Sequence, residues 1–152
     1  RVVEFNCRFG DPETQAVLSL LESPLGEVLD AAASGRLAEV GELQWSPDSA
    51  VIVVLAANGY PGTPDRGGNI AGPRLFAGDE AVHIVHAGTA GDEAGLTASG
   101  GRVLGVVGRG ADLVAARAAA YGAIDALEAP TLFCRRDIGA RAATGQIPTP
   151  VL

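Results

Sequence analysis

Methionine is absent from this 152-residue sequence, cysteine occurs only twice, and aromatic residues make up 5% of the chain. Two cysteines are too few for a disulfide framework or a zinc site. We therefore expect Cys7 and Cys134 to be buried free thiols, with Cys7 on an apolar face. Because large rings are scarce, alanine, valine and leucine must supply most of the hydrophobic core.

Basic residues and long apolar runs are also scarce. Eleven basic residues, all of them arginines, stand against 18 acidic residues, and the net charge of −7 argues against a general nucleic-acid surface, although a local phosphate site remains open. No apolar run approaches the roughly 18 to 20 residues of a membrane-spanning helix, and no signal peptide opens the chain. We expect a soluble, cytoplasmic protein without nucleic-acid or membrane partners.

The composition is that of a globular protein, with 47% hydrophobic and 19% charged residues. The length suits one domain, or one domain and a piece of another. The chain has no initiator methionine and opens directly inside a predicted strand. These two features indicate either a cut precursor or a fragment of a longer protein.

Apolar and polar side chains alternate over the first nine residues, as in a strand with one buried face. The polar face carries a carboxylate, an amide and a guanidinium, from Glu4, Asn6 and Arg8. Two hard oxygen ligands beside an arginine suit Mg²⁺ that carries a nucleotide phosphate. The alternation alone is more typical of an amphipathic edge strand whose glutamate and arginine pair weakly in solvent.

The four residues after this strand predict a sharp exit into a helix. Asp11 is the expected N-cap, Pro12 the first helical position, and Glu13 a residue of the first turn, directly after Gly10. The exposed amides of the helix N-terminus would then lie just past the polar face of the strand. There they could help to position an anion.

Two further helices are predicted. One begins at Ser23-Pro24 and ends at Gly35, with an apolar stripe that we expect to be core, and Trp45 is the single large anchor of the connection that follows. The other is capped by Asp112 and is followed by Pro130. Its apolar side chains recur every three or four residues, and a neighbouring, wetter face carries Arg117, Tyr121 and Asp125.

Strands are predicted over residues 50–57, 81–89 and 103–107, with a polar loop at 91–98. Turns and glycine loops join these strands more often than long crossover helices do. We therefore expect an α+β fold, with a mostly antiparallel sheet and helices against one face.

The run from Glu4 to Gln15, E-F-N-C-R-F-G-D-P-E-T-Q, resembles the carboxy-terminal end of the ATP-grasp core in the phosphoribosylamine–glycine ligase family, also called glycinamide ribonucleotide synthetases. Later segments are similar to the same family and extend the resemblance over nearly the whole chain. They are A-x-x-G-Y-P-G at 56–62, T-x-S-G-G-R-V-L at 97–104 and F-C-R-x-D-I-G-x-R-A at 133–142. At Ala140 the family pattern leads us to expect a bulkier residue.

The resemblance implies that residues 1–35 are the end of an ATP-grasp core, with its last strand and helix, that 36–142 form a C-terminal α+β domain, and that 143–152 are a flexible tail. It further implies an enzyme that joins glycine to 5-phosphoribosylamine while ATP becomes ADP and phosphate, through a glycyl phosphate. The residues that hold adenine in this family lie upstream, in domains of the same protein. The 152-residue chain alone is therefore expected to be inactive.

The resemblance also implies roles for individual residues. Glu4 and Asn6 match the positions that hold Mg²⁺ or Mn²⁺ against the phosphates of ATP, and Arg8 is the catalytic residue that would contact phosphate or acyl phosphate. Gly10, Asp11 and Glu13 are the expected contacts of the amine-bearing substrate. Two alternatives remain open: another ATP-grasp carboxylate–amine ligase, and a non-catalytic docking domain that keeps the fold.

Overall fold

The computed structural model describes residues 2–3, 5, 7–72, 80–92 and 95–147. Its helices are α1 (Glu13–Ser19), α2 (Leu25–Ala33), the 3₁₀ turn η1 (Leu37–Glu39), α3 (Leu113–Asp125) and α4 (Ala140–Ala143). Its strands are β1 (Ser49–Ala57), β2 (Asn69–Ile70), β3 (Val82–His86), β4 (Thr89–Asp92), β5 (Gly95–Ala98), β6 (Arg102–Gly110) and β7 (Leu132–Phe133). No helix in this part of the chain is both long and apolar enough to cross a membrane.

The strands form two antiparallel sheets, which confirms the predicted α+β class. One has the order β3-β6-β1-β7 and the other the order β2-β5-β4. The loop predicted at 91–98 is wrong, because β4 pairs with β5 there, from Thr89 opposite Ala98 to Asp92 opposite Gly95. Apart from Leu96 and two threonines, the two strands of this hairpin consist of glycine, alanine and aspartate, which are depleted in strands, so the side chains give little strand signal.

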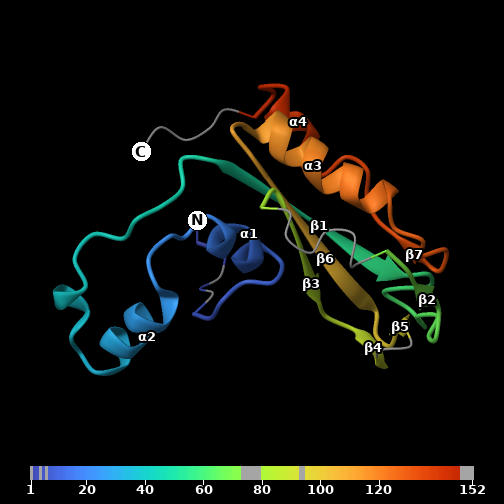
Figure 1. Ribbon diagram of the computed structural model, residues 1–152, viewed down its shortest axis with the longest axis horizontal. Helices are drawn as coiled ribbons and strands as arrows, with labels where there is room; N and C mark the ends of the chain where they lie inside the picture. Colours follow the sequence, from blue (N-terminus) through green and yellow to red (C-terminus); the bar gives the residue numbers. More distant parts are fainter. Residues whose placement is uncertain (1, 4, 6, 73–79, 93–94, 148–152) are drawn as a thin grey trace.

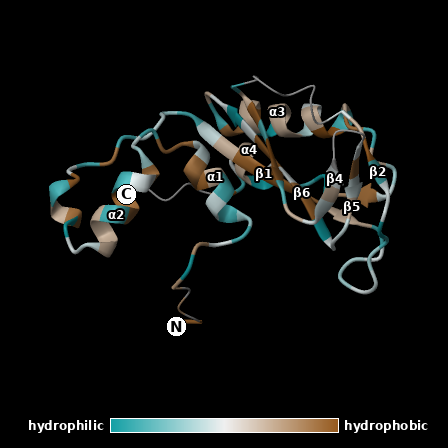
Figure 2. Cartoon of the chain, turned by 60° about the horizontal axis from the view of Figure 1, so that its bottom comes forward, coloured by the Kyte–Doolittle hydropathy of each residue, from teal (hydrophilic) through white to brown (hydrophobic). Residues whose placement is uncertain are grey.

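The core lies between α3 and one face of the β1–β6 pair. Both strands are nine residues long and rich in β-branched side chains, and Val53 is paired with Val106 at the centre of the sheet. These two valines, together with Ala116 and Ala120 of α3, are almost fully buried. Figure 1 shows α3 lying along the sheet, and Figure 2 shows that the apolar residues gather on β1 and β6.

A glycine of β6 sets how closely α3 can approach the sheet. A Cβ atom added at Gly108 would overlap the carbonyl oxygen of Ala116 and the backbone nitrogen of Ala120, and would lie 2.9 Å from the Cβ of Ala120. The helix therefore packs directly on the backbone of the strand.

As predicted, the side chain of Asp112 caps this helix, accepting a hydrogen bond from the Ala115 N–H at 2.7 Å. Tyr121 was expected on the wetter face of α3, and this prediction is wrong because Tyr121 is buried.

The helices before β1 contribute little to this core. α2 ends just before Gly35, as expected, and Gly35 has the positive φ of +70° that glycine tolerates best. The predicted core stripe of α2 is wrong in part, because Leu29 and Ala32 are exposed. Trp45 remains 46% exposed and bridges to Leu21, so it is a weaker anchor than its size suggested.

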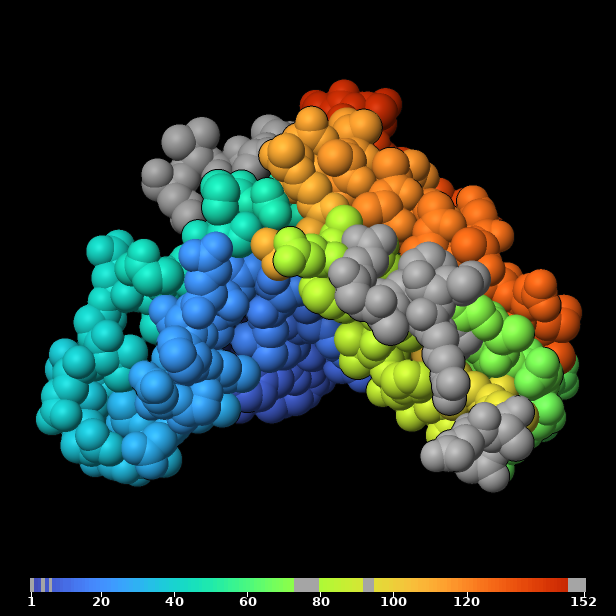
Figure 3. All heavy atoms as spheres, in the orientation of Figure 1, coloured from blue at the N-terminus to red at the C-terminus, as the bar shows by residue number. Residues whose placement is uncertain are grey.

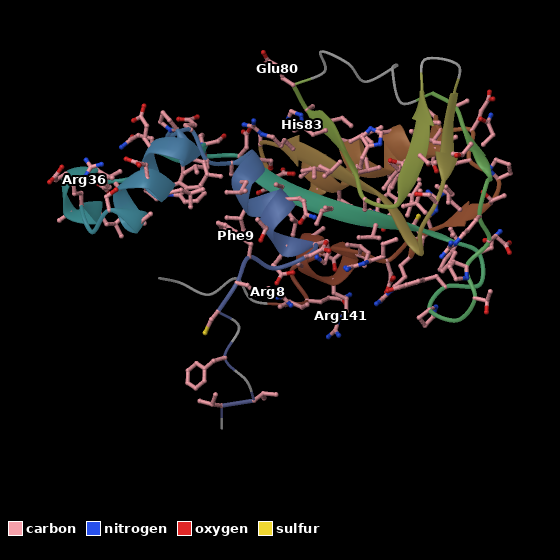
Figure 4. All side chains as sticks on the ribbon, turned by 90° about the horizontal axis from the view of Figure 1, so that it is seen from below. Arg8, Phe9, Arg36, Glu80, His83 and Arg141 are labelled. Atoms are coloured by element: carbon pink, nitrogen blue, oxygen red, sulfur yellow. The ribbon has the colours of Figure 1, made fainter. Side chains whose placement is uncertain are left out.

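The predicted opening strand is absent from the described residues between 2 and 9. Val3 is 96% exposed and Phe5 86% exposed, and Cys7 is also exposed, so the expected apolar face and the expected buried thiol are both wrong. A strand is stabilised by hydrogen bonds to a neighbouring strand, and no described strand pairs with this segment. Figure 4 shows Arg8 and Phe9 on a segment that leads away from the sheet.

We expect Gly108→Ala to lower the free energy of unfolding by about 1–3 kcal/mol, because the added methyl group would force α3 off the strand. The matched control is Gly122→Ala on α3, where an added Cβ meets nothing within 4 Å. That substitution is expected to raise the free energy of unfolding by up to about 1 kcal/mol. Urea denaturation followed by circular dichroism measures both, and equal effects of the two changes would contradict this packing.

Candidate functional site

The two predicted metal ligands, Glu4 and Asn6, lie outside the described residues. Arg8 is described and exposed, and its guanidinium donates to the carbonyl oxygen of Phe9 at 2.9 Å. The hydrogen bond that the structure gives Arg8 is therefore a local one, to the backbone of the next residue (Figure 4). Among the described residues, no group of three or more His, Cys, Asp or Glu side chains is placed to hold a metal ion.

The structure does bring together the three residues predicted to contact the amine-bearing substrate. The carboxylate of Glu13 lies against the backbone of Gly10, where an added Cβ would overlap it. Asp11 lies between them in the turn. The predicted capping arrangement is wrong by one residue, because Pro12 is the N-cap of α1 and no side chain caps this helix. Asp11 is instead engaged with residues outside the turn.

Asp11 is held by two side chains, one of them distant in the sequence. The guanidinium of Arg102, at the start of β6, lies 2.9 Å from the Asp11 carboxylate and also donates to its carbonyl oxygen at 3.3 Å. The side-chain amide of Gln15 donates to the same carboxylate at 3.1 Å. Sequence reasoning assigned no role to Gln15 or Arg102. The T-x-S-G-G-R segment contributes to the family resemblance, but nothing in its pattern indicates a contact with Asp11.

A cleft of about 270 Å³ opens beside this cluster, between α1 and the sheet. Asp11, Gln15 and Arg102 line one part of it. Ile52, Val54 and Val85, from β1 and β3, line another part and belong to the sheet face opposite α3. In Figure 3 the lower edge of the molecule is hollowed between the blue N-terminal residues and the yellow part of the chain. The predicted substrate residues therefore border a real cavity.

The exposed ion pair between Arg102 and Asp11 fixes geometry more than it stabilises the fold. The two side chains keep 42% and 53% of their surface exposed, and ion pairs of this kind contribute from about zero to 1 kcal/mol. The arginine nevertheless makes two contacts with a single residue, which restrains both the carboxylate and the backbone of the turn. The cleft is thus bordered by a preformed polar cluster with balanced charge.

Comparisons with known proteins identify relatives of this chain. A family model described as "Phosphoribosylglycinamide synthetase, C domain" matches residues 50–141. Phosphoribosylamine–glycine ligase of Mycobacterium tuberculosis is 58% identical over 147 residues, which is 96% of this chain and 33% of that protein. The Corynebacterium ammoniagenes protein of the same name is 51% identical over 96% of this chain and 34% of its own length.

A solved structure has the same fold. The crystal structure of phosphoribosylamine–glycine ligase from Thermotoga maritima superposes with a TM-score of 0.71 and 35% sequence identity. The superposition covers 90% of this chain and 33% of that one. This chain therefore spans about a third of the length of the relatives it matches.

The described groups with perturbed pKa values lie elsewhere, where the segment after β7 packs on α3. The Tyr121 hydroxyl donates to the carbonyl oxygen of Arg135 at 2.7 Å and accepts from the Ile138 N–H at 3.1 Å. Arg117 stacks on the Tyr121 ring at 4.6 Å and donates to the carbonyl oxygens of Arg136 and Ile138. Burial raises the pKa of Tyr121 and that of the Cys134 thiol. These contacts mainly fix the backbone of residues 135–138 to α3, so we interpret the cluster as structural.

Replacing Tyr121 with phenylalanine should lower the free energy of unfolding by about 1–3 kcal/mol, because two backbone groups lose their partner. The pKa of Tyr121 is raised above its ordinary value of 10.0 in the folded protein. Its contribution is therefore complete below pH 10.0 and is lost as the pH rises through the folded pKa.

The measurement is the free energy of unfolding of both proteins between pH 8 and pH 11. The difference between wild type and Tyr121→Phe should shrink at the alkaline end. Tyr60→Phe, at an exposed tyrosine, is the control. A difference that stays constant or grows with pH would contradict the assigned role.

Proposed function

Because this chain belongs to the phosphoribosylglycinamide synthetase C-domain family, we propose that it forms the carboxy-terminal part of a cytoplasmic ligase that joins glycine to 5-phosphoribosylamine. In this proposal ATP is converted to ADP and phosphate through a glycyl phosphate. The main support for this proposal is the sequence identity of 58%, over 96% of this chain, to the phosphoribosylamine–glycine ligase of Mycobacterium tuberculosis. Upstream domains of the same protein would supply the adenine site.

The opening residues would hold the metal and the phosphates. A carboxylate from Glu4 and an amide oxygen from Asn6 are hard donors of the type that Mg²⁺ and Mn²⁺ accept, so this donor set fits the metal. When bound, the ion would neutralise phosphate charge during phosphoryl transfer. Arg8 would lie near the transferred phosphate or the acyl phosphate, where a guanidinium can bind two oxygens at once.

The turn before α1 would present the amine to the acyl phosphate. Arg102 and Gln15 already engage the carboxylate of Asp11, so Asp11 would act mainly by fixing the shape of the turn. No described cation lies within ion-pair distance of Glu13, whose carboxylate rests on Gly10. We therefore assign to Glu13 the direct contact with the amine N–H groups, with Gly10 leaving room for that carboxylate.

In the full-length protein, Glu4→Gln and Asn6→Leu are each expected to lower turnover at least tenfold and to raise the Mg²⁺ concentration needed for half-maximal rate. Each change weakens or removes an oxygen ligand of the metal. Asp30→Asn, at an exposed carboxylate paired with Arg36, is the control and should behave as wild type. Calorimetric titration of Mn²⁺ in the presence of ADP gives a readout independent of turnover. Unchanged metal affinity in both variants would contradict the assignment of Glu4 and Asn6 as metal ligands.

The purified 152-residue chain is expected to release no phosphate from ATP in the presence of Mg²⁺, glycine and 5-phosphoribosylamine, whereas the full-length protein should do so. Replacing glycine with alanine or serine should abolish the activity of the full-length protein. Product from the short chain would contradict the need for upstream domains. Equal rates with other amino acids would favour a different ATP-grasp ligase, and no turnover with any of them would favour a non-catalytic domain.

A further inference from the structure

Two arginines of β6 hold the part of the chain that precedes β1. Arg102, at the start of the strand, contacts Asp11 in the turn before α1. Arg109, near the end of the strand, donates to the Oγ atom of Ser46 at 3.0 Å and to the carboxylate of Asp48 at 3.1 Å. About 23 Å of strand separates the two arginines, so the attachments lie at opposite ends of β6.

The attachment at Ser46 continues to the end of α1. The backbone N–H of Ser46 donates to the carbonyl oxygen of Leu20, the C-cap residue of α1, at 2.8 Å. The two neighbouring residues form an antiparallel bridge, with Leu21 opposite Trp45. The segment that leads into β1 is therefore paired with the segment that leaves α1. Through this pairing, Arg109 restrains the end of the helix.

The helix α1 has little else to fix it on the sheet. It packs against β1 and β6, but none of its seven residues is buried (Figure 1). A helix of this length is only about 10 Å long and is not stable by itself. Its position therefore depends on the contacts at its two ends, which are made through Arg102 and Arg109.

Stability alone does not account for an arginine at position 109. Its side chain is only 25% exposed, and its Nε–H is buried without a hydrogen-bond partner among the described residues. A buried donor without a partner costs free energy. An apolar side chain of similar length would fill the same space without that cost, but it could not hold Ser46 and Asp48.

The contacts of Arg109 lie where two parts of the protein meet. The family model begins at residue 50, directly after Asp48, whereas α1 precedes the matched residues. The first turn of α1 carries Glu13, the residue to which the proposed function assigns the amine contact. A shift of α1 on the sheet would move this carboxylate. Displacements of about 1 Å, even when caused far from the reacting atoms, can slow an enzyme about a hundredfold.

We propose that Arg109 is a positioning residue of the ligase. It fixes the end of α1 through Ser46 and Asp48, and thereby the place of Glu13. It acts at the end of the helix opposite Glu13 and is not among the residues that line the cleft. The link from Arg109 to α1 rests on the observed contacts, whereas the link from α1 to the reaction rests on the proposed function.

Hydrogen exchange of the full-length protein tests the attachment without any substrate. Arg109→Gln should speed amide exchange in residues 20–23 and 44–46 about fivefold, the effect of losing one hydrogen bond, and should leave α3 unchanged. The control is Arg135→Gln, at an exposed arginine that pairs with Asp137 of its own segment at 2.6 Å. The control should exchange as wild type in all these regions. Equal exchange in Arg109→Gln and wild type would overturn the attachment.

Steady-state kinetics of the full-length protein test the link to the reaction. Arg109→Gln should raise the KM for the amine-bearing substrate about fivefold, with the KM values for ATP and glycine within about twofold of wild type. Arg109→Lys keeps a donor and a charge for Ser46 and Asp48, so it should restore part of the loss. Arg135→Gln should leave all three KM values unchanged.

Arg109→Met separates positioning from a merely structural role. This change removes both contacts together with the unpaired Nε–H. It should raise the KM for the amine-bearing substrate as Arg109→Gln does, while the melting temperature stays at or above that of wild type. A lower melting temperature with unchanged KM values would show that Arg109 only stabilises the fold, and would overturn the inference.

The exchange and kinetic results distinguish failure of this inference from failure of the proposed function. A wild-type protein that forms product, with no selective change of KM in Arg109→Gln, would overturn the positioning role even if exchange at 20–23 and 44–46 is faster. A wild-type protein that forms no product, with faster exchange in Arg109→Gln, would overturn the proposed reaction and support the attachment of α1 by Arg109.

Discussion

The strand β6 is the element on which both the core and the candidate site depend. It pairs along its length with β1 on one side and β3 on the other, so its backbone is fixed in the sheet. Toward its end, Gly108 lets α3 pack directly on that backbone. At its start, Arg102 reaches the turn before α1 and holds Asp11. A displacement of this one strand would therefore disturb the hydrophobic core and the turn before α1 together.

The sequence was sufficient to predict the elements that are specified locally. β1 is a continuous β-branched run, and α3 has a capping aspartate and a helical apolar period, so the sequence predicts both. The opening strand and the β4–β5 hairpin could not be predicted correctly, because their state depends on pairing partners rather than on their own side chains. The family resemblance indicates Gly10, Asp11 and Glu13, which lie within four residues of one another in the sequence. Arg102 stands 91 residues from Asp11, and only the fold places them in contact.

The described structure also brings two segments of different character together at one cleft. The N-terminal turn carries the carboxylates, whereas the sheet supplies the apolar wall of the cleft. Neither part forms the cleft alone. The cleft is therefore a joint feature of the N-terminal turn and the sheet.

The way the turn is attached makes it sensitive to ionic strength. Dissolved ions screen exposed charges over a Debye length of about 8 Å at 0.15 M salt, whereas they hardly affect the contact between α3 and β6. The Arg102–Asp11 pair is half exposed, so rising salt would weaken the attachment of the turn while the sheet and its helix remain folded. The chain thus combines a core that charge screening hardly affects with a turn whose attachment depends on the ionic strength of the solution.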